Sequence, residues 1–150
     1  MPFEEKMTWV SLVVAVAVPV VYVAIMLGRL GETTAAEIAY QWPLLIAIGA
    51  SIVLSIVGAI VAAIGTGISA ELRGKSAGDE IDLKDERDKQ IGRRGDLVGF
   101  YVSSVGMVGV LALTMLEYDY FWIANALYLS FVAGAVVAAV VKIASYHRGF

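Results

Sequence analysis

The residues best suited to chemistry in this chain are carboxylates gathered in one central segment. They are Asp79, Glu80, Asp82, Asp85, Glu86 and Asp88. Oxygen ligands of this kind could hold a hard cation such as Mg²⁺. Basic residues alternate with them, however, and the pairs Lys84 with Asp88 and Asp85 with Lys89 have the i, i+4 spacing of a salt-bridged helix. We therefore favour a solvated, charged helix or a protein-binding surface over a metal or catalytic site.

The rest of the chain supplies few groups for catalysis. It has no cysteine, which excludes disulfides and thiolate chemistry. Its one histidine, His147, lies near the C-terminus, where we expect it to be solvated. The central basic residues are matched by acids and lack interleaved aromatic rings, which argues against nucleic-acid binding. These observations predict a protein that is not an enzyme and that needs no cofactor.

The elements that flank the central segment are four long apolar runs, at about 7–28, 42–67, 96–116 and 121–144. The chain is 59% hydrophobic, whereas soluble domains are roughly 45–50% apolar. A helix of about 20 residues spans a hydrocarbon core of about 30 Å. We therefore predict an all-α, integral membrane four-helix bundle, with residues 1–150 as one membrane domain. The segment 68–95 forms a charged helical connection between the second and third membrane helices.

The distribution of positive charge predicts the orientation of these helices. Ten of the eleven Lys and Arg residues lie in the N-terminal tail, the central segment and the C-terminal tail, and Arg29 is the exception. The positive-inside rule then places both termini and segment 68–95 in the cytoplasm of a multi-pass plasma-membrane protein. Tyr40, Trp42, Tyr118 and Tyr120 form an aromatic belt at the opposite membrane surface.

Small residues recur every four positions in three of the apolar runs. These positions are Ser51, Ser55, Ala59, Ala63 and Gly67 in the second run, Gly95, Gly99 and Ser103 in the third, and Ala126, Ser130, Gly134 and Ala138 in the fourth. Because helices in lipid associate largely through close backbone packing, each row predicts a helix contact. The rows fit a tight bundle or, if one row faces outward, a homo-oligomer, and the sequence does not choose between these.

The string DERDKQIGRRGDLVGFY carries a possible family signature. It resembles the Asp-Glu-Arg, Ile, Arg pattern that precedes a membrane helix in a family of small multi-pass prokaryotic membrane proteins of unknown function. The matching positions are Asp85, Glu86, Arg87, Ile91 and Arg94. The resemblance implies a membrane topology and a cytoplasmic interaction motif. Gly92 and Gly95 leave open whether this helix continues into the third membrane helix or hinges at the surface.

Two functions remain after these exclusions. The interior of the apolar runs contains no Asp, Glu, Lys, Arg or His, the residues that mark ion coupling and proton relays in membranes. This favours a non-enzymatic accessory or regulatory subunit that acts through protein contacts, with the lipid bilayer and a membrane or cytoplasmic protein as partners. The alternative is a small transporter or channel subunit for an uncharged or weakly charged solute, in which small-residue faces line a path between helices.

Overall fold

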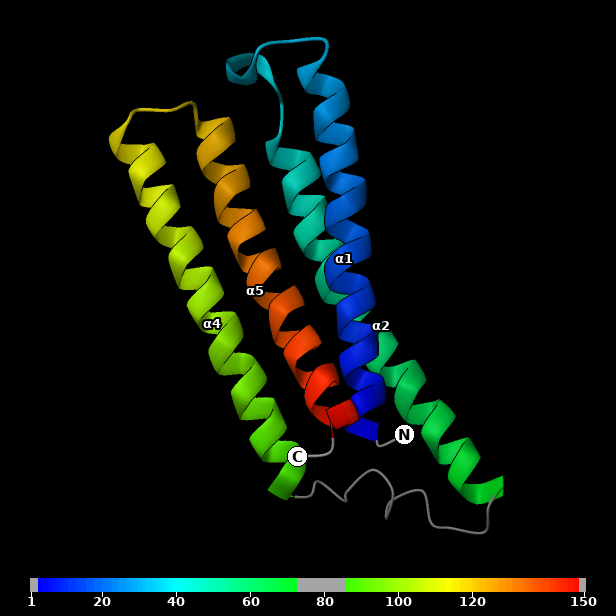
Figure 1. Ribbon diagram of the computed structural model, residues 1–150. Coiled ribbons are helices and arrows are strands. Elements are labelled where there is room, and N and C mark those ends of the chain that lie inside the picture. The colour runs from blue at the N-terminus through cyan, green and yellow to red at the C-terminus, as the bar shows by residue number, and fades with distance from the viewer. Residues whose placement is uncertain (1–2, 73–85, 149–150) are drawn as a thin grey trace.

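The computed structural model describes residues 3–72 and 86–148, and all regular structure within these ranges is helical (Figure 1). The four long helices are α1 (Phe3–Leu30), α2 (Gln41–Leu72), α4 (Glu86–Met115) and α5 (Tyr120–Arg148). A short 3-10 helix, η1 (Ala35–Glu37), lies in the connection between α1 and α2. The predicted all-α class is confirmed.

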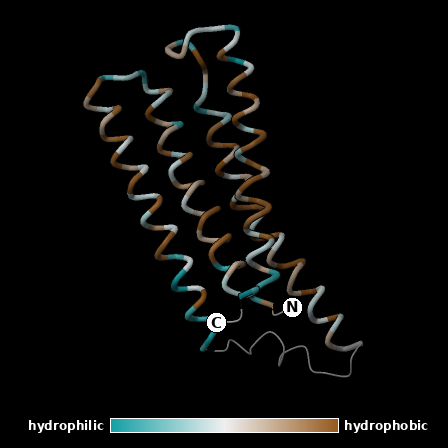
Figure 2. Tube along the Cα trace, viewed as in Figure 1, coloured by the Kyte–Doolittle hydropathy of each residue, from teal (hydrophilic) through white to brown (hydrophobic). Residues whose placement is uncertain are grey.

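Each long helix has the length and composition needed to cross a membrane. Their lengths are 28, 32, 30 and 29 residues, which at a rise of about 1.5 Å per residue correspond to roughly 42–48 Å. This matches a bilayer of about 40–45 Å including its head-group regions. Apolar residues fill most of each helix, and hydrophilic ones gather toward the ends (Figure 2). By length and composition all four helices could span a membrane, as expected for a multi-pass membrane protein.

The principal helix contacts follow the order α4, α5, α1, α2 (Figure 1). In Figure 1 the later part of α2 leans away from the other helices, and both chain termini lie at the same end of the bundle. We call this the terminal end. The opposite end carries the α1–α2 connection and the α4–α5 turn, and we call it the loop end.

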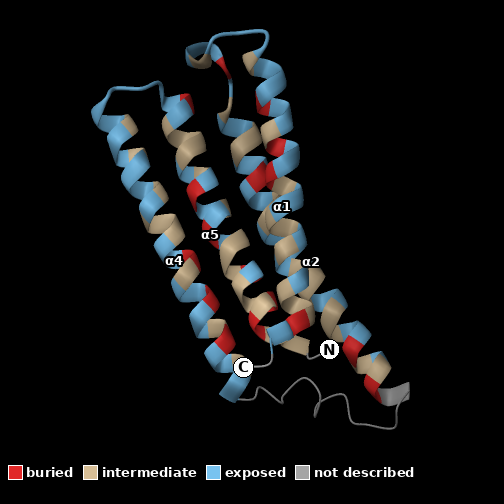
Figure 3. Ribbon diagram, in the orientation of Figure 1, coloured by how far each residue is buried: buried red, intermediate tan, exposed pale blue. Residues whose placement is uncertain are grey.

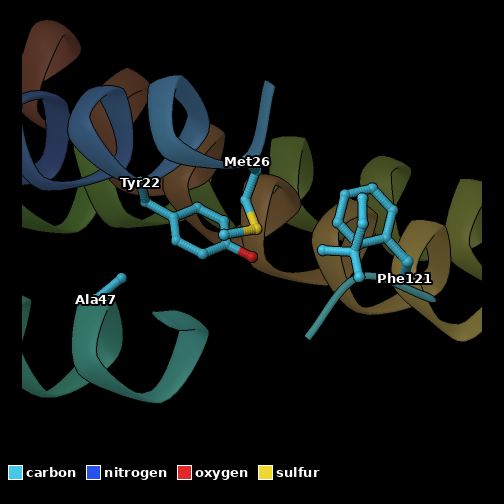
Figure 4. Close-up of a cluster of buried hydrophobic side chains, with 5 residues drawn as sticks. Tyr22, Met26, Ala47 and Phe121 are labelled. Carbon is cyan, nitrogen blue, oxygen red and sulfur yellow. The ribbon is translucent and has the colours of Figure 1, made fainter. Parts of the chain in front are cut away.

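The buried side chains are few, as expected where lipid covers the outer faces (Figure 3). One cluster near the loop end contains Tyr22, Met26, Ala47 and Phe121 together with Ile38 (Figure 4). Since these residues come from α1, α2, α5 and the α1–α2 connection, the cluster fixes that connection against the bundle.

A hydrogen-bonded pair lies beside this cluster. The Tyr22 hydroxyl donates to Asn125 Oδ1 at 2.7 Å, and Asn125 Nδ2 donates to the Phe121 carbonyl at 2.7 Å. The Tyr128 ring packs edge-on against Tyr22 with centroids 5.2 Å apart. The polar atoms of Asn125 are thus satisfied within apolar surroundings, and the pair links α1 to α5.

The helix α4 has no hinge at the membrane surface near Gly92 and Gly95. Residues 86–95 are helical and continue without a break through Gly92 and Gly95 into the apolar part of α4. The helix tolerates Gly95 because that residue is buried in a close contact with α5. The charged part of the motif and the third apolar run therefore form one element of 30 residues.

Candidate functional site

The motif residues divide into an anchor and an exposed face. Ile91 is only 4% exposed, whereas Arg87 and Arg94, at spacings of four and three from it, are exposed. With Ser145 of α5 these three residues line a small hollow of about 130 Å³. The structure therefore brings Arg87, Ile91 and Arg94 to one side of the start of α4.

The acidic part of the motif lies apart from that hollow. Glu86 is exposed, and its Oε1 accepts a hydrogen bond from Lys89 Nζ at 2.6 Å. This i, i+3 pair is the kind of contact expected on a solvated helix, where an ion pair adds little stability. Asp85, the first motif position, lies outside the described residues.

Polar contacts tie α4 to α5 at the terminal end. Lys142 Nζ of α5 lies 2.6 Å from Asp96 Oδ1 of α4. Tyr146 of α5 lies close to the carboxylate of Asp88 of α4, one turn before the buried Ile91. These contacts fix the charged start of α4 against the last turns of α5.

Further contacts at the terminal end join α1 to α5 and to α2. Glu5 is 7% exposed, and its Oε1 lies 3.6 Å from His147 Nε2 of α5. Lys6 Nζ donates to Thr66 Oγ1 of α2 at 3.2 Å. The burial of Glu5 could not be predicted, since an acid in a first helical turn complements the helix dipole at an exposed position as well. His147 is largely exposed, as expected, but it lies beside a carboxylate.

The charged side chains at the terminal end are suited to the recognition of a charged partner. Within residues 3–72 and 86–148 there is no group of three or more His, Cys, Asp or Glu side chains that could hold a metal ion. The contacts found there are between hydroxyls, carboxylates and cations of neighbouring helices, which hold the helices together. The exposed charges at this end include those of Glu86, Arg87 and Arg94 at the start of α4.

The small-residue rows of the third and fourth runs face each other between α4 and α5. A Cβ atom added to Gly99 would lie 2.6 Å from the Gly134 carbonyl oxygen and 2.8 Å from Ala138 Cβ. A Cβ on Gly134 would in turn meet Ser103. At Gly95 an added Cβ would lie 2.9 Å from the Ala138 carbonyl oxygen. The two backbones approach so closely that these positions accept no larger side chain without movement.

The row in α2 has different surroundings. Ser51 and Ser55 line a cavity of about 550 Å³ between α1, α2 and α5. The other polar side chains in its wall are Ser11 and Tyr128, and the remaining wall is apolar. The later members of the row, Ala59, Ala63 and Gly67, are half-buried.

Two glycines that lie at helix contacts, Gly58 and Gly106, were not predicted because they are outside the four-residue rows. A Cβ on Gly58 would meet the Val10 side chain of α1, so Gly58 lies at the α1–α2 contact. A Cβ on Gly106 would meet Ser130 of α5. Gly106 is three residues after Ser103, so a row with steps of three as well as four residues includes it.

Comparison with known proteins identifies no relative. No protein-family model, curated protein or solved structure matches the chain. The resemblance carried by Glu86, Arg87, Ile91 and Arg94 therefore stays a prediction. Function has to be inferred from the geometry of the chain itself.

Proposed function

We propose that the protein is a non-enzymatic accessory or regulatory subunit that acts through protein contacts at its terminal end. The observation that carries this proposal is the start of α4, where exposed charges stand on a helix of membrane-spanning length. Ile91 anchors this turn and leaves Arg87 and Arg94 on the surface. We place this surface in the cytoplasm, on the distribution of positive charge.

Rigidity supports a role in binding. The start of α4 is held by the Lys142–Asp96 pair and by the close approach of Gly95 to α5. A surface that is ordered before it meets a partner loses less conformational entropy on binding than a flexible one. The helix that carries Glu86 and Arg87 is thus held against α5, which suits the selection of a complementary protein surface.

Co-purification from native membranes tests this function. We expect the intact protein to recover a partner, and the double variant Glu86→Arg with Arg87→Glu to lose it. This variant exchanges two charges without changing their sum, so the orientation signal is preserved. A matched control, Glu32→Gln with Glu37→Gln, alters two exposed acids at the loop end and should recover the partner as the wild type does. If the charge exchange changes nothing, the proposal is wrong.

The cavity between α1, α2 and α5 favours a second candidate, a small carrier or channel subunit for an uncharged solute. Because its wall is mainly apolar, with only hydroxyl groups as polar contacts, such a solute would itself have to be largely apolar. The variant Ser55→Leu would fill part of the cavity. Flux of an uncharged solute into liposomes, abolished by this variant, would support transport, and the absence of flux with the wild-type protein would exclude it.

A further inference from the structure

The two connections at the loop end enclose a second hollow, which we call the loop pocket. Its volume is about 560 Å³, and its wall comes from residues 35–41 and 114–123. Small-molecule sites typically have volumes of about 300–1,000 Å³. The loop pocket therefore has the size of a ligand site, and it lies at the opposite end of the bundle from the motif (Figure 1).

Aromatic rings form part of the wall. The ring centroids of Tyr40 and Phe121 are 5.8 Å apart, and their planes are inclined by 78°, so they make a corner. Phe121 is 3% exposed, which fixes this corner in the bundle, whereas Tyr118 is 52% exposed and stands in the α4–α5 turn. The faces of such rings carry negative potential and attract cations, above all quaternary ammonium groups.

The charges around the loop pocket have the same sign. Glu117 and Asp119 belong to its wall, and no Lys or Arg is among the described residues that line it. The α1–α2 connection holds two further acids, Glu32 and Glu37, and the last turn of α1 holds one basic residue, Arg29. Arg29 Nη1 donates to the carbonyl of Ala39 at 2.7 Å. With four acids and one base, the loop end has a negative potential that concentrates cations.

The composition of the wall favours an organic cation over a metal ion. Ca²⁺ requires about six to eight oxygen ligands, and Mg²⁺ requires near-octahedral oxygen coordination. The part of the chain that the structure describes contains no group of three or more possible metal ligands of the His, Cys, Asp and Glu type. Two carboxylates beside aromatic rings instead match a large, weakly hydrated monovalent cation.

We propose that the loop pocket binds a quaternary ammonium group of the choline type. Tyr40 and Tyr118 provide ring surfaces, the buried Phe121 supports the Tyr40 ring from within the bundle, and Glu117 and Asp119 provide the opposing charge. The same chemistry is found in free quaternary ammonium compounds and in the head group of phosphatidylcholine. This proposal is independent of the protein contacts proposed for the terminal end.

Calorimetric titration of the purified full-length protein in maltoside micelles tests the proposal. We expect choline chloride to bind saturably and sodium chloride at equal ionic strength to give no saturable heat. Phosphatidylcholine added to the micelles then identifies the source, since a lipid head group in the pocket would weaken choline binding by competition. If this lipid has no effect, the ligand is a free cation. If choline and sodium behave alike, the proposal is overturned.

Matched variants distinguish a specific binding site from general attraction of cations by the negative charge of the loop end. Tyr118→Leu removes an exposed ring and should weaken choline binding roughly 2- to 30-fold, the range expected for a cation–π contact, whereas Tyr118→Phe should retain it. Glu117→Gln should weaken binding more than Glu32→Gln, which removes the same charge outside the pocket wall. Equal effects of the two glutamate variants, or unchanged binding by Tyr118→Leu, would show that no specific site exists.

Discussion

Substitution of Gly99 by alanine should destabilise the bundle, although alanine is the better helix former. The new Cβ would lie 2.6 Å from the Gly134 carbonyl oxygen, whereas ordinary contacts of a Cβ begin at 3.4 Å. The helices α4 and α5 would therefore have to separate by about 0.8 Å. Overpacking of this kind costs roughly 1–3 kcal/mol, and we expect about 2–3 because the partner is backbone. The helix-propensity gain of about 0.5–1 kcal/mol offsets part of this.

The net loss should be about 1–2.5 kcal/mol in the free energy of unfolding, measured by titration with SDS from mixed micelles and followed by circular dichroism. Gly109→Ala on the same helix is the matched control, because an added Cβ there meets nothing within 4 Å. It should leave stability unchanged or raise it by up to about 1 kcal/mol. If Gly99→Ala were as stable as Gly109→Ala, the backbones of α4 and α5 would not be in close contact at Gly99.

Two smaller effects follow from the polar contacts and can be measured in the same unfolding assay. Tyr22→Phe removes the hydroxyl that donates to Asn125 and should cost about 0.6 kcal/mol, the average for hydrogen bonds between membrane helices, and at most about 1.7 kcal/mol; an unchanged stability would show that the bond contributes nothing. Lys142→Met keeps an unbranched side chain against Gly95 but loses the ion pair with Asp96, whose side chain is 70% exposed. It should cost less than about 1 kcal/mol, and a larger loss would mean that the charge is needed to hold α4 on α5.

The sequence predicted the helical class and the approximate positions of the membrane helices, because long uncharged runs have few other stable structures in lipid. It did not predict how far the helices extend beyond those runs. The structure continues α2 to Leu72, and the charged helix expected within segment 68–95 is, from Glu86 on, part of α4. Gly92 and Gly95 weakened the prediction of a continuous helix, since glycine is a poor helix former in isolation.

The candidate sites could be predicted less well from the sequence than the helices. The row from Gly95 to Ser103 indicated a helix contact, but which helix lies opposite depends on the packing of the whole bundle. The row of α2 in fact borders a cavity at Ser51 and Ser55. The burial of Glu5 and the loop pocket could not be predicted for the same reason, because each arises where segments distant in the sequence meet.

Cysteine labelling of intact cells tests the proposed orientation most directly. The chain has no cysteine of its own, so single cysteines report one position each. Thr34→Cys at the loop end and Gln90→Cys on α4 are both at exposed positions. An impermeant maleimide should label Thr34→Cys in intact cells and Gln90→Cys only after the membrane is permeabilised. Labelling of Gln90→Cys from outside the intact cell would contradict a cytoplasmic terminal end and the protein contacts proposed for it.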